Sequence, residues 1–68
     1  MAKVKVPQAV LDGLEAVRRS GLSNMLDRPV VVELAEAFGF EDAARWIEGH
    51  RTEFAEGLFK GFEPQGDD

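Results

Sequence analysis

Glycine residues close four successive amphipathic segments, and this pattern constrains the fold more than any other feature of the chain. The glycines are Gly21, Gly39, Gly49 and Gly61, and each follows a stretch in which apolar residues recur every three or four positions. That spacing places the apolar side chains on one face of a helix, and glycine is the residue most often found just past a helix end. The sequence therefore predicts four short helices that bury their apolar faces together.

The predicted helices run from near 7 to about 20, from 28 to 38, from about 41 to 48 and from 52 to 60. Gly13, inside the first helix, weakens a helix by about 1 kcal/mol relative to alanine, so we expect another helix to approach closely there. Leu22 is expected to fold back onto Val17 after the helix end at Gly21. The predicted apolar faces comprise Val10, Leu11, Leu14, Val17, Val31, Leu34, Ala35, Phe38, Phe40, Ala43, Ala44, Ile47, Phe54, Ala55, Leu58 and Phe62.

The fold class expected from these segments is all-α, a compact single-domain bundle of four short helices with a short extended N-terminal arm. The arm is residues 1–6, the helical domain is 7–62, and 63–68 is a flexible acidic tail. Lys3 to Val6 alternate like a strand, but a lone strand has nothing to pair with; a strand shared across a dimer is the alternative. A chain of 68 residues buries only about 60% of the surface that its unfolded form exposes. Because the chain has no cysteine, no disulfide can stabilise the fold, and self-association would add stability.

Catalytic and metal-binding side chains are scarce, and we expect neither an enzyme nor a metal or other cofactor. A nucleophile needs a base within hydrogen-bond reach, and the one histidine, His50, is far in sequence from Ser20 and Ser23. His50 and Glu53 have the spacing of a partial metal site, but two ligands do not complete one. We interpret His50 as a helix-end residue.

The segment from Gly21 to Pro29 is the longest one between predicted helices, and loops of this kind often carry binding groups. It combines small polar residues with a large apolar pair. Gly21 and Asp27 are explained as helix-end residues. A purely structural alternative has Met25 and Leu26 plugging the bottom of the bundle and Asn24 bonding to loop backbone. The candidate partner-binding residues are Ser23, Asn24, Met25, Leu26, Asp27 and Arg28.

Charge is divided unevenly along the chain, whose net charge is −5. Residues 1–32 hold five cations and three carboxylates, whereas residues 33–68 hold three cations and ten carboxylates. The acidic half repels nucleic acid, so nucleic-acid binding is disfavoured. Arg18 and Arg19 nevertheless form a candidate basic patch, which would suit the alternative function of a nucleic-acid-binding regulator.

The other alternative function is an acidic DNA mimic or inhibitor of a host protein. It requires the acidic side chains to form a continuous stripe, made of Glu33, Glu36, Glu41, Asp42, Glu48, Glu53 and Glu56.

Aromatic residues are concentrated in the second half, and their simplest role is in the core. Phe59 and Phe62 lie nearest the acidic tail, where partial exposure is expected. They are the candidate self-association residues, so a homodimer is one expected assembly.

The sequence from Ala16 to Asp27, with its Ser-Gly-x-x-Asn-Met-x-Asp pattern, resembles a family of short phage and prophage proteins that is known only as a domain of unknown function. The resemblance continues through 35–40 and 46–55 and covers about Val6 to Phe62. It implies an origin in a phage or mobile element and supplies no catalytic residues. Together with the N-terminus, which does not resemble a signal peptide, it implies a cytoplasmic location. The expected function is a small non-enzymatic module that binds a phage or host protein.

Overall fold

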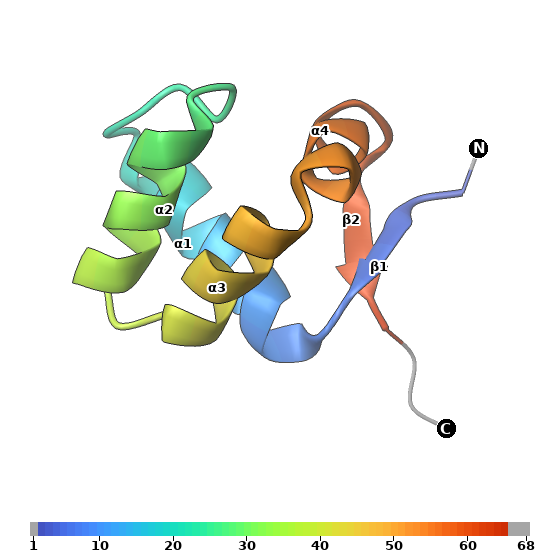
Figure 1. The fold of residues 1–68 in the computed structure, drawn as a ribbon, viewed down its shortest axis with the longest axis horizontal. Helices are drawn as coiled ribbons and strands as arrows, with labels where there is room; N and C mark the ends of the chain where they lie inside the picture. The colour runs from blue at the N-terminus through green and yellow to red at the C-terminus, as the bar shows by residue number, and fades with distance from the viewer. Residues whose placement is uncertain (1, 66–68) are drawn as a thin grey trace.

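The computed structural model describes residues 2–65, and its helices follow the glycine pattern (Figure 1). The elements in chain order are β1 (Val4–Val6), α1 (Gln8–Ser20), α2 (Arg28–Ala37), α3 (Glu41–Gly49), α4 (Arg51–Lys60) and β2 (Phe62–Pro64). Each predicted helix boundary agrees with the observed one to within about one residue. The predicted bundle of four short helices with an extended N-terminal arm is confirmed, and its radius of gyration of 10.9 Å matches the ~11 Å expected for a compact chain of this length.

Small side chains dominate the core, which lies where α1, α2 and α3 meet and extends to α4 and β1. Because alanine and valine are short, these helices approach closely, and the core contains no buried polar side chain among the described residues. Phe38, predicted on the buried face of its helix, is instead 39% exposed at the end of α2. The buried apolar residues are Val6, Val10, Leu14, Val17, Val31, Val32, Ala35, Ala43, Ala44, Ile47 and Phe54.

Gly13 lies where α1 crosses α3, as its position in the sequence predicted. A Cβ atom built on Gly13 would overlap the Cβ atom of Ala43 and lie 2.9 Å from that of Phe40. Since real Cβ atoms do not approach so closely, glycine is required at this crossing. Gly21 adopts the predicted left-handed conformation, with φ of 67°, but Leu22 remains 67% exposed and does not fold back onto Val17.

A short parallel sheet joins the two ends of the described chain, as Figure 1 shows. Val4 pairs with Phe62 and Val6 with Pro64, and the amide of Gln65 donates to the carbonyl oxygen of Val6 over 2.7 Å. The expectation that the N-terminal strand lacks a partner within the chain was therefore wrong. Glu63 and Pro64, assigned to the flexible tail, belong to β2, while residues 66–68 of that tail lie outside the described residues.

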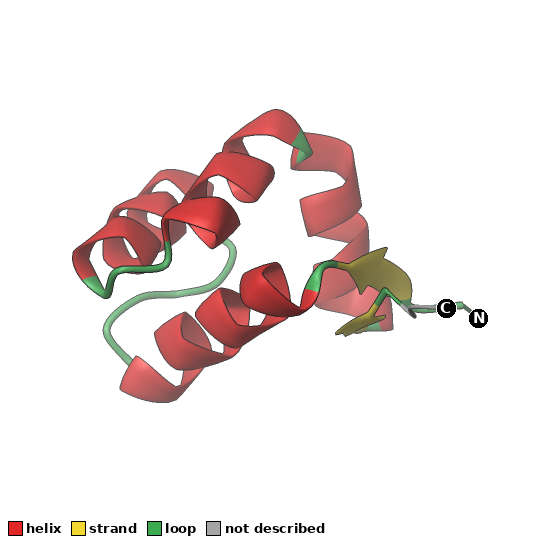
Figure 2. Ribbon diagram, turned by 90° about the horizontal axis from the view of Figure 1, so that it is seen from below, coloured by secondary structure: helices red, strands yellow, loops and turns green. Residues whose placement is uncertain are grey.

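Helix α4 stands apart from α2, and the two strands lie beside it at one end of the molecule (Figures 1 and 2). It packs against β1 and α3. Gly57 of α4 leaves room for the ring of Phe62, because a Cβ atom at that position would overlap the ring. The ring also meets Trp46 edge-on, with 6.3 Å between centroids. Because of these contacts, α4 lies far enough from α1 to leave a hollow on the surface between the two helices.

Within the described residues, no helix is long and apolar enough to cross a membrane.

Candidate functional site

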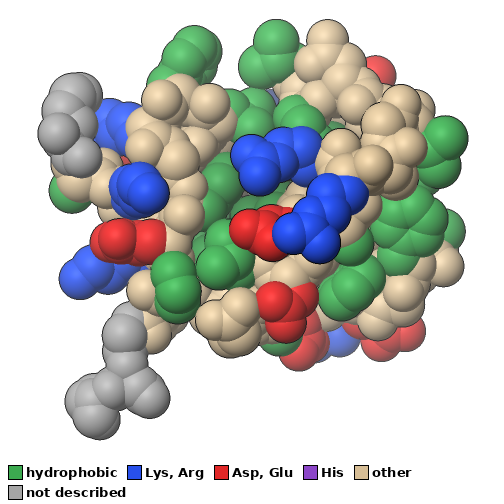
Figure 3. Space-filling model, turned by 180° about the vertical axis from the view of Figure 1, so that it is seen from behind, with side chains coloured by type: hydrophobic (Ala, Val, Ile, Leu, Met, Phe, Trp, Pro, Cys, Tyr) green, Lys and Arg blue, Asp and Glu red, His purple; other side chains and the backbone are tan. Residues whose placement is uncertain are grey.

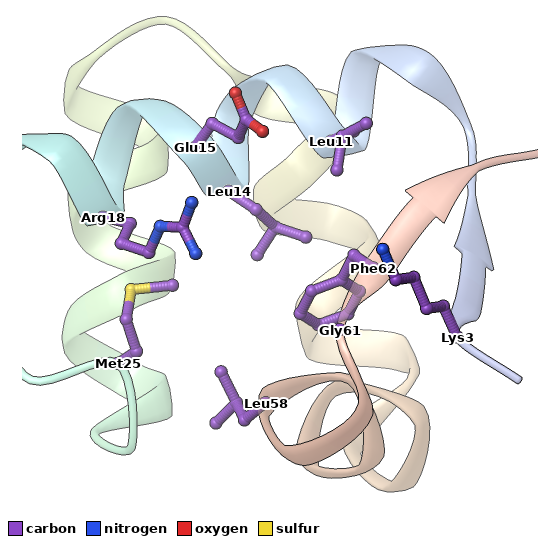
Figure 4. Close-up of a pocket in the computed structure, with 9 residues that line it drawn as sticks. All are labelled: Lys3, Leu11, Leu14, Glu15, Arg18, Met25, Leu58, Gly61 and Phe62. Atoms are coloured by element: carbon purple, nitrogen blue, oxygen red, sulfur yellow. The ribbon is translucent and has the colours of Figure 1, made fainter. Parts of the chain in front are cut away.

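A hollow of about 400 Å³ opens between α1, the loop that joins α1 to α2, and α4 (Figure 4). Leu14 of α1, Met25 of the loop and Leu58 of α4 point toward one another across it, and the ring of Phe62 closes one side. Its floor is therefore apolar. We call it the inner hollow, and it is lined by Lys3, Leu11, Leu14, Glu15, Arg18, Met25, Leu58, Gly61 and Phe62.

A second hollow of about 270 Å³ adjoins the first and shares Leu58 with it. It lies between the start of α2 and α4. We call it the outer hollow and the two together the α1–α4 groove. The outer hollow is lined by Leu26, Arg28, Arg51, Phe54, Ala55, Leu58 and Phe59.

Two large apolar side chains border the outer hollow and are exposed to solvent. Leu26 is 68% exposed and Phe59 is 86% exposed. Exposed Leu22, in the same loop, lines neither hollow. Single exposed apolar residues are ordinary on protein surfaces, but an exposed pair beside an apolar groove has the composition of a contact patch.

Cations surround the groove although the chain as a whole is acidic. Lys3 and Arg18 border the inner hollow and Arg28 and Arg51 the outer one, whereas Glu15 is the one carboxylate among the lining residues. The carboxylate of Glu15 points away from the cavity in Figure 4. In Figure 3, hydrophobic side chains lie in a hollow that Lys and Arg side chains border, with Asp or Glu side chains among them.

The loop from Gly21 to Asp27 is shaped by Asn24. The side-chain Oδ1 of Asn24 accepts a hydrogen bond from the amide of Leu26 over 2.9 Å, and its carbonyl oxygen accepts one from the amide of Asp27 over 2.9 Å. The predicted bonding of Asn24 to loop backbone is confirmed. This turn packs Met25 against the core and leaves Leu26 exposed.

Of the six loop residues predicted to bind a partner, the structure brings Met25, Leu26 and Arg28 to the groove. Ser23 and Asn24 do not line it; the Ser23 hydroxyl lies 3.4 Å from the Asn24 carbonyl oxygen. Asp27 precedes α2, where its carbonyl oxygen accepts the amide of Val31.

The two predicted basic residues separate because consecutive helical positions point in different directions. Arg18 lines the inner hollow, whereas Arg19 lies outside it and pairs with Glu15 over 3.7 Å. The predicted self-association residues both line the groove, but they differ in exposure. Phe59 is exposed, while Phe62 is half-buried and packs against the core.

Helix α4 supplies the groove residues that the sequence did not indicate, Leu58 and Arg51. Leu58 was expected only as part of an apolar helix face. No local signal marks either residue, because the groove exists only once α4 is placed opposite a loop some thirty residues earlier in the chain.

His50 sits between α3 and α4, in agreement with its interpretation as a helix-end residue. Its Nδ1 lies 2.8 Å from the carbonyl oxygen of Trp46, and its ring stacks on the Trp46 ring with 4.5 Å between centroids. Within residues 2–65, no three His, Asp or Glu side chains lie close enough together to hold a metal ion.

The acidic residues of the second half gather in part between α2 and α3. Glu36, Glu41 and Glu48 line a shallow hollow there, and Arg45 lies among them. Three of the seven carboxylates expected in the acidic stripe therefore share this hollow with a cation.

Comparison with known proteins gives one family match. A family model described as Domain of unknown function (DUF5049) matches residues 7–61. The match includes all four helices and the loop with Asn24, and it leaves out both strands. Searches of curated proteins and of solved structures give no significant match.

Proposed function

The chain belongs to the family of this domain of unknown function (DUF5049), and from that premise we propose that it is a small, non-enzymatic module that binds a protein partner through the α1–α4 groove. The observation that carries the proposal is the groove with its apolar floor, beside which Leu26 and Phe59 are exposed. Exposed apolar side chains lose contact with water when a partner covers them, which contributes about 25 cal/mol per Å² of apolar area.

The composition of the groove favours a protein over a nucleic acid. Its floor is apolar, and nucleic-acid surfaces are read through phosphate contacts and base edges rather than through an apolar cavity. Arg19, half of the predicted basic patch, already pairs with Glu15. Interface centres, by contrast, combine large apolar side chains with arginine.

Affinity capture from a bacterial host lysate tests the proposal through a matched pair of variants. Leu22 and Leu26 belong to the same loop and are exposed to nearly the same extent, but only Leu26 lines the groove. We expect Leu26→Ser to lose the proteins that the wild type captures and Leu22→Ser to retain them. The proposal would be contradicted if both variants captured the same proteins equally. It would also be contradicted if the wild type captured no protein beyond those that bind to beads alone.

A phage or mobile-element origin is a separate part of the proposal. It is supported by the resemblance of the segment from Ala16 to Asp27 to short phage and prophage proteins, and this segment lies inside the matched residues. Flanking genes with structural or regulatory phage functions are the expected result of sequencing the locus. A locus of chromosomal housekeeping genes would contradict that origin.

A further inference from the structure

We infer that the α1–α4 groove takes an acidic amphipathic helix of another protein, with two apolar side chains seated in the two hollows and carboxylates on its flanks. This inference rests on the proposed function and names the chemistry of the partner. It follows from the shape of the groove and from the sign of its charge.

The shape argument comes from Leu58, which lines both hollows. The two hollows therefore adjoin at Leu58. On a helix, residues three or four positions apart lie on the same face with about 5–6 Å between their Cβ atoms. A helix laid along the groove thus places successive apolar side chains on either side of Leu58, in the manner of helix-in-groove recognition.

The charge argument comes from the contrast between the groove and the rest of the molecule. The chain carries a net charge of −5, yet the groove has four cations around it and one carboxylate. Within residues 2–65, none of those four cations has a carboxylate oxygen within 4.0 Å. An acidic segment is repelled by most of the surface and attracted to the groove, which favours its correct placement.

The same charges disfavour a second copy of the chain as the occupant. Two copies each carry −5, and their mutual repulsion opposes association at low salt. The exposed aromatic Phe59 remains available to an acidic partner, since it borders the outer hollow beside Arg51.

Selection from a random peptide library displayed on phage tests the inference without knowledge of the natural partner. Peptides of about sixteen residues are selected on the wild-type protein, and the enriched ones are synthesised. We expect enriched sequences with an excess of Asp and Glu and with apolar residues spaced three or four apart.

Two charge reversals locate the binding site of those peptides. Arg51→Glu and Arg45→Glu change the net charge equally, but only Arg51 borders the groove, whereas Arg45 lies among carboxylates between α2 and α3. Arg51→Glu is expected to weaken binding about tenfold, which corresponds to ~1.4 kcal/mol, and Arg45→Glu to weaken it less than twofold. Circular dichroism of both variants confirms that they fold.

The outcomes separate the inference from the proposed function. Enriched peptides that are neutral or basic but lose affinity for Leu26→Ser overturn the inference and leave the function standing. Failure to enrich any peptide overturns the inference, while the proposed function is still decided by capture with Leu26→Ser. Binding of a DNA or RNA oligonucleotide in the groove instead overturns both. A solution mass of twice 7.5 kDa that returns to the monomer in Leu26→Ser also overturns the inference, since a second copy then covers the groove.

Discussion

Asn24 determines which of two neighbouring leucines reaches the groove. Its hydrogen bonds to the amides of Leu26 and Asp27 close a turn that places Leu26 at the outer hollow, while Leu22 lines neither hollow. The sequence predicted that Asn24 bonds to loop backbone, because asparagine stabilises such turns. It placed Leu26 among the candidate binding residues, but it wrongly expected Leu22 to fold back onto Val17, and both leucines are exposed.

Replacing Asn24 with alanine removes the acceptor for the amide of Leu26 and is expected to lower the free energy of unfolding by about 0.5–1 kcal/mol. Asn24→Asp keeps an oxygen at the same position and is expected to retain the wild-type value more closely. Urea denaturation of both variants measures the difference. Equal midpoints for the two variants would show that the side-chain hydrogen bond does not shape the loop.

Gly13 offers a second test at the scale of single residues. Gly13→Ala forces a Cβ atom into Ala43 and Phe40, and overpacking of this kind costs about 1–3 kcal/mol. Gly49→Ala is the matched control, because a Cβ atom there has open space and Gly49 is also helical. Denaturation midpoints are expected to fall for Gly13→Ala and to stay level or rise for Gly49→Ala. A Gly13→Ala protein as stable as the wild type would contradict the close crossing of α1 and α3.

At the scale of elements, the helices were predictable and the sheet was not. Each helix repeats its apolar pattern over two or more turns, and a glycine follows or ends it, so the signal is local. The strands have three residues each, and although Lys3 to Val6 alternate like a strand, nothing in the sequence supplied a partner for them. Val4 pairs with Phe62 across all four helices, and no local sequence feature of Phe62 to Pro64 indicates a strand.

The sheet is expected to contribute to stability through Val6, which is fully buried, more than through Val4, which is only partly buried. Val6→Ala leaves a cavity among the helices and is expected to cost about 1–3 kcal/mol, in line with other deletions of buried methyl groups. Val4→Ala is expected to cost less than half as much. Urea denaturation measures the free energy of unfolding of both variants. An equal decrease in the two variants would show that β1 is not anchored in the core.

At the scale of the whole molecule, the groove results from the arrangement of segments that are distant in the chain. The predicted loop supplied Met25, Leu26 and Arg28, whereas Leu58 and Arg51 come from α4. Sequence indicated the loop because its composition is unusual for a helix connection. Sequence indicated Phe59 of α4 as an exposed contact residue but not Leu58 or Arg51, because the position of α4 depends on the long-range pairing of β1 with β2 and on the space that Gly57 leaves for Phe62.

The separation of charge over the molecule predicts how partner binding depends on salt. Because exposed charges are screened over about 10 Å at 0.1 M salt, affinity for an acidic peptide is expected to fall as salt rises from 50 to 500 mM. The loss is expected to be smaller for Arg28→Glu, which removes one of the groove cations. Isothermal titration calorimetry at several salt concentrations measures both slopes. An affinity that is constant or that rises with salt would show that charge does not attract the partner.

The most direct test of the groove as the binding surface is a titration of ¹⁵N-labelled protein with a selected acidic peptide, followed by amide chemical shifts. The account predicts shifts at Met25, Leu26 and Leu58, which line the groove, and none at Glu36 and Arg45, which line the hollow between α2 and α3. Shifts concentrated at Glu36 and Arg45, with the groove amides unchanged, would contradict it.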